Sequence, residues 1–225
     1  MLGAYVAPSE PVHAACLVVG GSGGGMGVSK AVADGLAAAG IASLAVAYHG
    51  AGVRRPVMRD VPLEGFAAAT GWLQRTAGVD GSAVTLLGIS RGSEAAMLVG
   101  AMFDDVTGPV VGVVPGNVVA CSFPPGHAAW LFDESAVPYV NQPGPECIDP
   151  SAIIPVEQLR SLLVVSAGED EIWPSGPMAE AIVARRQAHR RPTQHVHLPY
   201  AGHTNALQGA WRPIVDFIKR GSAPS

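Results

Sequence analysis

The chain has 225 residues, a length that suits a single domain with a sizeable core. Its 48% hydrophobic and 14% charged residues exclude a disordered chain, and its net charge of -4 argues against a general nucleic-acid binder. The sequence has no apolar run of membrane-spanning length, no signal-peptide pattern at the N-terminus and only three scattered cysteines. We therefore expect a cytoplasmic protein with no membrane or nucleic-acid partner and no zinc site.

Short apolar runs alternate with helical patterns along most of the chain. Continuous apolar runs predict buried strands, and apolar residues three and four apart predict helices. The predicted strands are 14–19, 43–47, 83–87, 110–114, 162–166 and 195–198, and the predicted helices are 27–39, 63–77, 91–103, 175–189 and 205–219. This order predicts one α/β domain over residues 1–225, with a doubly wound, mostly parallel sheet of about six strands.

One segment, residues 116–155, interrupts this alternation. It is rich in proline and shows little periodicity, and stretches of this length without regular structure are usually functional. We expect it to form a lid or wall over a site, and the alternative is a floppy insertion. Trp130 and Tyr139 in this segment, together with Trp173, are weak candidates for lining a substrate pocket, although such aromatic residues more often only pack a lid.

The pentapeptide Gly88-Ile89-Ser90-Arg91-Gly92 matches the pattern G-x-S-x-G. It lies between the predicted strand AVTLL and the predicted helix RGSEAAMLVG, where a sharp turn lifts the serine hydroxyl clear of the sheet. The turn also places the N–H groups of the helix N-terminus beside the serine. Ser90 is therefore the candidate nucleophile, and the alternative is a small-residue turn that only caps a helix.

A serine nucleophile needs a base, and the base needs an acid that orients it. His203 follows the last predicted strand in a glycine-containing loop, which makes it the candidate base. The loop after the preceding strand contains three adjacent carboxylates, Glu169, Asp170 and Glu171, and residue type alone does not choose among them. We favour Asp170, because aspartate is the usual partner of the histidine.

A run of glycines, GGSGGGMG, follows the first predicted strand at positions 20–27. Neither the spacing of a dinucleotide-binding fingerprint nor that of a phosphate-binding P-loop fits it. A loop of this kind lets the backbone approach a substrate, so Ser22 or Gly23 is the candidate oxyanion donor, with the N–H of Arg91 as the second donor. The alternative is a flexible turn before a helix.

These motifs together resemble those of an α/β-hydrolase. Within that fold the chain is similar to the C-terminal catalytic domain of acyl-CoA thioester hydrolases and bile acid-CoA:amino acid N-acyltransferases, with dienelactone hydrolases as more distant relatives. The matching stretches are VVGGSGGGMG, ASLAVAYHG, GISRGSEAAML, AAWLFDESAVPYV, IPVEQLRSLLVVSAGEDEIWPS and LPYAGH. The resemblance implies Asp170 as the catalytic acid, and serine rather than cysteine at position 90 favours hydrolysis over acyl transfer.

The motifs thus predict a serine hydrolase that acts on a small-molecule ester or thioester through Ser90, His203 and Asp170. This chemistry requires neither a metal nor an organic cofactor. One alternative is an acyltransferase or an eliminating, lyase-type enzyme with the same three residues, because one fold hosts many reactions. A second alternative is a binding module that keeps the fold without catalysis.

Overall fold

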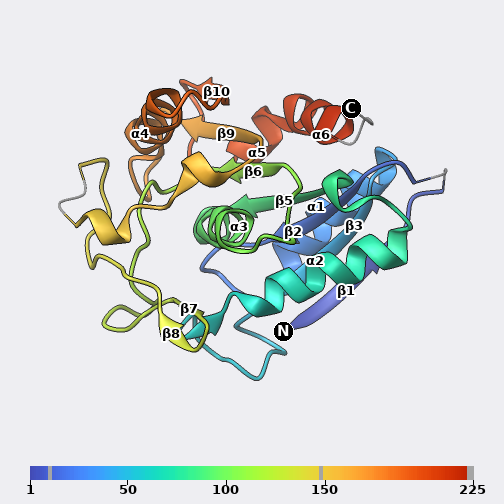
Figure 1. Ribbon diagram of the computed structural model, residues 1–225, viewed down its shortest axis with the longest axis horizontal. Coiled ribbons are helices and arrows are strands. Elements are labelled where there is room, and N and C mark those ends of the chain that lie inside the picture. Colours follow the sequence, from blue (N-terminus) through green and yellow to red (C-terminus); the bar gives the residue numbers. More distant parts are fainter. Residues whose placement is uncertain (10–11, 147–148, 222–225) are drawn as a thin grey trace.

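A computed structural model describes residues 1–9, 12–146 and 149–221 (Figure 1). At its centre lies a seven-stranded sheet with the order β1-β3-β2-β5-β6-β9-β10. Six strands run parallel, and β1 pairs antiparallel with β3 at one edge. The strands are β1 (Leu2–Val6), β2 (Ala15–Val19), β3 (Ala42–Ala47), β5 (Val84–Ile89), β6 (Val110–Val113), β9 (Leu162–Ala167) and β10 (Gln194–Leu198).

Helices cover both faces of the sheet, as the continuous apolar strands predict. Strand β2 shows how: Ala15, Leu17 and Val19 belong to one core cluster, whereas Cys16 and Val18 belong to the other. The first cluster also receives α2 (Glu64–Ala77), α3 (Arg91–Met102) and α4 (Ser175–Ala188), and the second receives α1 (Gly27–Ala38), α5 (Ala206–Gly209) and α6 (Trp211–Gly221). The chain therefore folds into three layers, with a sheet between two sets of helices.

The predicted six-stranded parallel sheet and its helices are confirmed, with two differences. Strand β1 is a seventh strand, which the sequence did not predict. It is short, and its residues are exposed or half-buried. The predicted helix 205–219 is divided at Ala210 into α5 and α6. Pro213 explains the division, because it has no N–H to donate to the carbonyl four residues earlier.

The segment 116–155 packs onto the first core cluster. Strands β7 (Trp130–Phe132) and β8 (Ser135–Ala136) form a small sheet with β4 (Val61–Pro62). Figure 1 shows this sheet beside the N-terminal end of α2. Short 3-10 helices form at η1 (Gly81–Ala83), η2 (Pro150–Ala152) and η3 (Val156–Gln158). Residues 147 and 148 of the segment lie outside the described residues.

Two buried arginines hold the backbone at the start of this segment and just beyond its end. Arg91 in α3 donates a 2.8 Å hydrogen bond from Nη2 to the carbonyl oxygen of Ala120. Arg186 in α4 donates from Nη1 to the carbonyl oxygens of Val156 and Leu159. The same guanidinium also donates to Pro192 and Thr193, which precede β10. Backbone carbonyls without a strand partner are thus satisfied by side chains from two helices.

Candidate active site

Ser90 occupies a strained turn between β5 and α3. Its backbone has φ 54° and ψ −122°, a conformation that is unfavourable for a residue with a side chain, and the surrounding structure holds it. The Ser90 N–H donates to the Val113 carbonyl at 2.8 Å, and the Ser93 hydroxyl donates to the Ser90 carbonyl at 2.6 Å. Gly92 is required here, because a Cβ atom at this position would lie 2.3 Å from the Val19 carbonyl oxygen.

His203 and Asp170 lie together at the ends of neighbouring strands. The imidazole Nδ1 lies 2.8 Å from Asp170 Oδ1 and 3.0 Å from Oδ2. The side chains of His203 and Asp170 are 11% and 2% exposed, so the pair is largely shielded from water. Oδ1 of Asp170 also accepts from the N–H groups of Ile172 and Trp173, which fixes the carboxylate against the imidazole.

Two neighbours of Asp170 support the histidine loop in different ways. Glu171 Oε2 accepts a 3.0 Å hydrogen bond from the backbone N–H of His203, and this bond lowers the pKa of the Glu171 carboxyl. Glu169 is exposed, and its backbone N–H donates to the Ala201 carbonyl. Of the three adjacent carboxylates, Asp170 alone is hydrogen-bonded to the imidazole among the described residues.

The glycine-rich loop 20–25 crosses directly over the nucleophile turn. A Cβ atom at Gly21 would lie 3.2 Å from Ser90 Cβ and 3.6 Å from Ser90 Oγ. The hydroxyl of Tyr48 donates to the Gly20 carbonyl at 3.0 Å, which ties the start of the loop to the end of β3. Ser22 and Gly23, the candidate oxyanion donors, lie in this loop, and Arg91 begins helix α3 immediately after Ser90.

A cleft of about 450 Å³ joins these parts. Ser90, His203, Ser22 and Gly23 all line it. The rest of its wall comes from the glycine loop, from α1 and from the α5 region: Gly20, Gly21, Gly24, Gly25, Val28, Ser29, Ala31, Val32, Ile89, Thr204, Leu207 and Gln208. Among the described residues, none from 116–155 lines this cleft, and no hydrogen bond joins the Ser90 hydroxyl to the imidazole.

The three aromatic candidates for pocket lining occupy different places. Trp130 is fully buried in the core, and its indole nitrogen donates to the carboxylate of Glu94, so it faces no cleft. Tyr139 packs half-buried against the same core cluster. Trp173 lies next to the base: its ring meets that of His203 edge-on at 6.0 Å, and its Nε1 donates to the Val114 carbonyl.

Two buried residues near the site, Glu94 and His49, were not predicted from the sequence to have a role there. Glu94 is completely buried beside Arg91, and burial raises the pKa of its carboxyl. His49 lies 4% exposed under the glycine loop, with its Nε2 3.1 Å from the Ser22 carbonyl oxygen. The signal for Glu94 was a charged residue inside an otherwise small and apolar helix, and that for His49 was its position directly after a buried strand.

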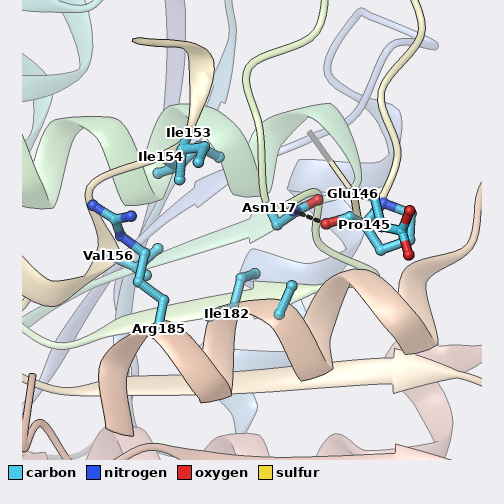
Figure 2. A pocket seen from close by; sticks show the side chains of 9 residues that line it. Asn117, Pro145, Glu146, Ile153, Ile154, Val156, Ile182 and Arg185 are labelled. Carbon is cyan, nitrogen blue, oxygen red and sulfur yellow. Dashed lines mark hydrogen bonds between the residues drawn. The ribbon is translucent and has the colours of Figure 1, made fainter. Parts of the chain in front are cut away.

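A second cavity of about 210 Å³ lies between the returning part of segment 116–155 and α4 (Figure 2). Its walls include Asn117 and Ile182, and the side-chain amide of Asn117 donates to the Pro145 carbonyl at 3.1 Å. None of Ser90, Asp170 or His203 lines it. The described residues contain no cluster of three or more side chains suited to a metal, and no helix among them could span a membrane.

The three-layer fold and the turn that carries Ser90 define the class of protein: this is an α/β-hydrolase fold. An alpha/beta hydrolase from Penicillium sp. sh18 superposes with a TM-score of 0.68 at 13% identity, covering 100% of both chains. A putative dienelactone hydrolase from Klebsiella pneumoniae superposes with a TM-score of 0.67 at 13% identity, covering 96% of this chain and 91% of that one.

The particular family follows from the sequence comparison. The family described as "BAAT / Acyl-CoA thioester hydrolase C terminal" matches residues 61–125 and 134–220, and the chain belongs to this family. Human acyl-coenzyme A thioesterase 1 is 31% identical over 203 residues, which cover 81% of this chain and 47% of that protein. The chain thus spans about half the length of the curated relatives it matches. The resemblance drawn from the motifs is confirmed.

Proposed function

We propose that the protein is a serine hydrolase that cleaves an ester or thioester through an acyl-enzyme. The observation that supports this proposal is the shared cleft, which is lined both by a serine on a strained turn and by a histidine whose Nδ1 is held by a buried aspartate. The identity of the relatives as acyl-coenzyme A thioesterases supports a thioester substrate. The widely spaced cysteines favour a reducing compartment, and we propose the cytoplasm.

The reaction uses each member of the site once in each half. The Ser90 oxygen attacks the acyl carbonyl carbon, and His203 Nε2 takes the serine proton. Asp170 keeps the proton of His203 on Nδ1 and stabilises the imidazolium. His203 then protonates the leaving alcohol or thiol, which departs and leaves the acyl group on Ser90. Water attacks this ester with the same histidine as the base, and the free acid and the serine are released.

The negative charge that develops on the carbonyl oxygen needs donors that are already in place. The backbone N–H of Arg91 and that of Ser22 or Gly23 are the proposed donors, because the helix N-terminus and the glycine loop meet beside Ser90. Val28, Val32 and Leu207 give the cleft an apolar wall, and no lysine or arginine is among its described lining residues. This wall fits an uncharged acyl group.

Intact-mass spectrometry after incubation with a fluorophosphonate tests the proposal. The wild-type protein is expected to gain one adduct, and Ser90→Ala is expected to gain none while keeping its fold. Ser151→Ala is the matched control, because Ser151 is an exposed serine in a short helix of the segment 116–155 and should leave the labelling unchanged.

A panel of p-nitrophenyl esters and acyl-CoA thioesters then identifies the fate of the acyl group. Free acid as the product supports hydrolysis, whereas a new ester or amide identifies an acyltransferase and an alkene identifies an eliminating enzyme. A folded wild-type protein that neither gains an adduct nor turns over any ester would overturn the triad and favour a non-catalytic binding module.

A further inference from the structure

The imidazole of His49 lies under the glycine-rich loop, just beyond the end of β3. It is almost fully buried, and its Nε2 is 3.1 Å from the carbonyl oxygen of Ser22. A carbonyl oxygen only accepts, so Nε2 carries the hydrogen and donates it. The other ring nitrogen, Nδ1, is buried and has no hydrogen-bond partner among the described residues. The imidazole therefore makes one side-chain hydrogen bond among the described residues, which it donates to the Ser22 carbonyl.

The loop rests on this residue through its backbone as well. The Gly25 N–H donates to the His49 carbonyl oxygen at 2.8 Å. Gly24 has φ 66°, and a Cβ atom there would lie 2.9 Å from both Cδ2 and Nε2 of the imidazole. The ring and the loop therefore touch without space for any side chain between them, and a shift of the ring must move the loop.

The hydrogen bond from His49 to the Ser22 carbonyl also fixes the direction of the next N–H, that of Gly23. The carbonyl of Ser22 and the N–H of Gly23 belong to the same planar trans peptide, so they point in opposite directions. Holding the carbonyl toward His49 turns the Gly23 N–H away from His49. Gly23 lines the cleft with Ser90 and His203, whereas His49 is not among the residues that line it. A 3.3 Å hydrogen bond from the Gly24 N–H to the Gly21 carbonyl spans this peptide, but no other described hydrogen bond holds the Ser22 carbonyl itself, and glycine permits the peptide to rotate.

We propose that His49 is a positioning residue that aims the Gly23 N–H into the cleft as an oxyanion donor. The inference rests on the proposed hydrolase function and selects Gly23 over Ser22 as the loop donor. His49 touches no substrate in this proposal: it acts only through the Ser22–Gly23 peptide. Burial lowers the pKa of His49, which agrees with a neutral ring that donates through one nitrogen.

Two variants test the role of the hydrogen bond that His49 donates to Ser22. His49→Leu removes the hydrogen bond, whereas His49→Gln places an amide N–H close to the position of Nε2. Loss of an oxyanion donor typically lowers kcat on the order of 10²- to 10³-fold. We expect His49→Leu to lower kcat by about 10- to 100-fold, because the donor is displaced rather than deleted. KM should change much less, and His49→Gln should recover most of the kcat.

A trifluoromethyl ketone that forms a hemiketal with serine gives a second readout. Its affinity should fall in parallel with kcat in His49→Leu and recover in His49→Gln, which a merely structural role would not produce. Tyr48→Phe is the matched control, because it removes a hydrogen bond to Gly20 in the same loop but leaves the Ser22–Gly23 peptide held. Should His49→Leu not fold, His49→Asn, whose amide is too short to reach Ser22, takes its place.

Two results would overturn the inference. One is a folded His49→Leu or His49→Asn variant with wild-type kcat and wild-type inhibitor affinity, and the other is a Gln variant as impaired as the Leu variant. Failure of the proposed function has a different signature, because the wild-type protein itself would then show no fluorophosphonate adduct and no turnover.

Discussion

The indole nitrogen of Trp130 donates a 3.0 Å hydrogen bond to the carboxylate of Glu94, and both side chains are completely buried. Glu94 lies in the first turn of the helix that begins after Ser90, and its Oε1 is 3.3 Å from the Arg91 Nε. The bond therefore links segment 116–155 to the helix whose first N–H is a proposed oxyanion donor. Burial of the carboxylate makes each of its few partners important.

Removing this donor should destabilise the protein. Trp130→Phe keeps an aromatic ring in the core but removes the shorter of the two hydrogen bonds to Glu94 Oε2, which leaves only that from the Ala120 N–H at 3.4 Å. We expect a loss of about 1.5–3 kcal/mol in the free energy of unfolding, the range for hydrogen bonds to charged groups. Trp72→Phe is the control, because Trp72 is 43% exposed, and it should change stability far less. Urea denaturation of both variants measures the difference, and equal losses would contradict the argument.

The aspartate beside His203 should affect the rate far more than the fold. Asp170→Asn keeps the size of the side chain but no longer favours the proton on Nδ1 of the imidazole. We expect kcat for an activated ester to fall on the order of 10³- to 10⁴-fold. Glu169→Gln, at the exposed neighbour, should stay close to wild-type activity. A comparable loss in both variants would show that the loop as a whole, and not Asp170, matters.

The close contact at Gly92 predicts a stability effect of a different origin. An added methyl group in Gly92→Ala would lie 2.3 Å from the Val19 carbonyl oxygen and 2.4 Å from that of Gly20. Because backbone atoms must move, we expect a cost of about 1–3 kcal/mol and slower labelling of Ser90 by a fluorophosphonate. Gly27→Ala adds a methyl group with no atom within 4 Å and should keep wild-type stability and labelling.

The ion pair between Arg185 and Glu157 predicts a dependence of stability on pH. Two hydrogen bonds from the guanidinium, one of 2.7 Å, hold the pKa of Glu157 below its usual value of 4.5. A lowered pKa of a carboxyl contributes stability above the unfolded value, and this stability is lost as the pH falls through the folded value. Since the Arg185 side chain is 34% exposed, we expect only about 1 kcal/mol at pH 7.

Glu157→Gln measures this contribution directly. The variant should be less stable than the wild-type protein at pH 7, and the difference should shrink as the pH falls below 4.5. Asp34→Asn is the control, because the Lys30–Asp34 pair is exposed on both sides and should contribute little. A difference for Glu157→Gln that does not vary with pH would assign the effect to packing instead of charge.

Much of this molecule was predictable, because its buried strands carry a strong and simple signal. Strands β2, β3, β5, β6 and β9 are buried along almost their whole length, as expected for a parallel sheet covered on both faces, whereas the edge strand β10 is largely exposed. The positions of Ser90, Asp170 and His203 followed from the ends of these strands, where side chains converge in this class of fold. The structure brings Asp170 and His203 into contact, and it places Ser90 and His203 in one cleft.

The unpredicted features depend on contacts between distant parts of the chain. Strand β1 has five residues and, among the described strands, pairs with β3 alone, so its own sequence gives little indication of a strand. Trp130 was a weak candidate for lining a pocket because of its residue type. It is buried in the core instead, where it donates a hydrogen bond to Glu94, 36 positions away. The support that His49 gives to Ser22 likewise depends on the crossing of two loops, which no local pattern describes.

The buried arginines that hold segment 116–155 determine how the domain can be shortened. Excising the segment would remove the carbonyl oxygen of Ala120, the acceptor of Arg91, whereas Val156 and Leu159, the acceptors of Arg186, lie just beyond it and would remain. Arg91 would then keep the carboxylate of Glu94 as its partner, but its Nη2 would be buried without an acceptor, at a cost of about 1–3 kcal/mol. Excision would also remove Trp130, a donor to Glu94, so two buried charged groups of α3 would each lose a partner, and a shortened domain would need a substitute for both.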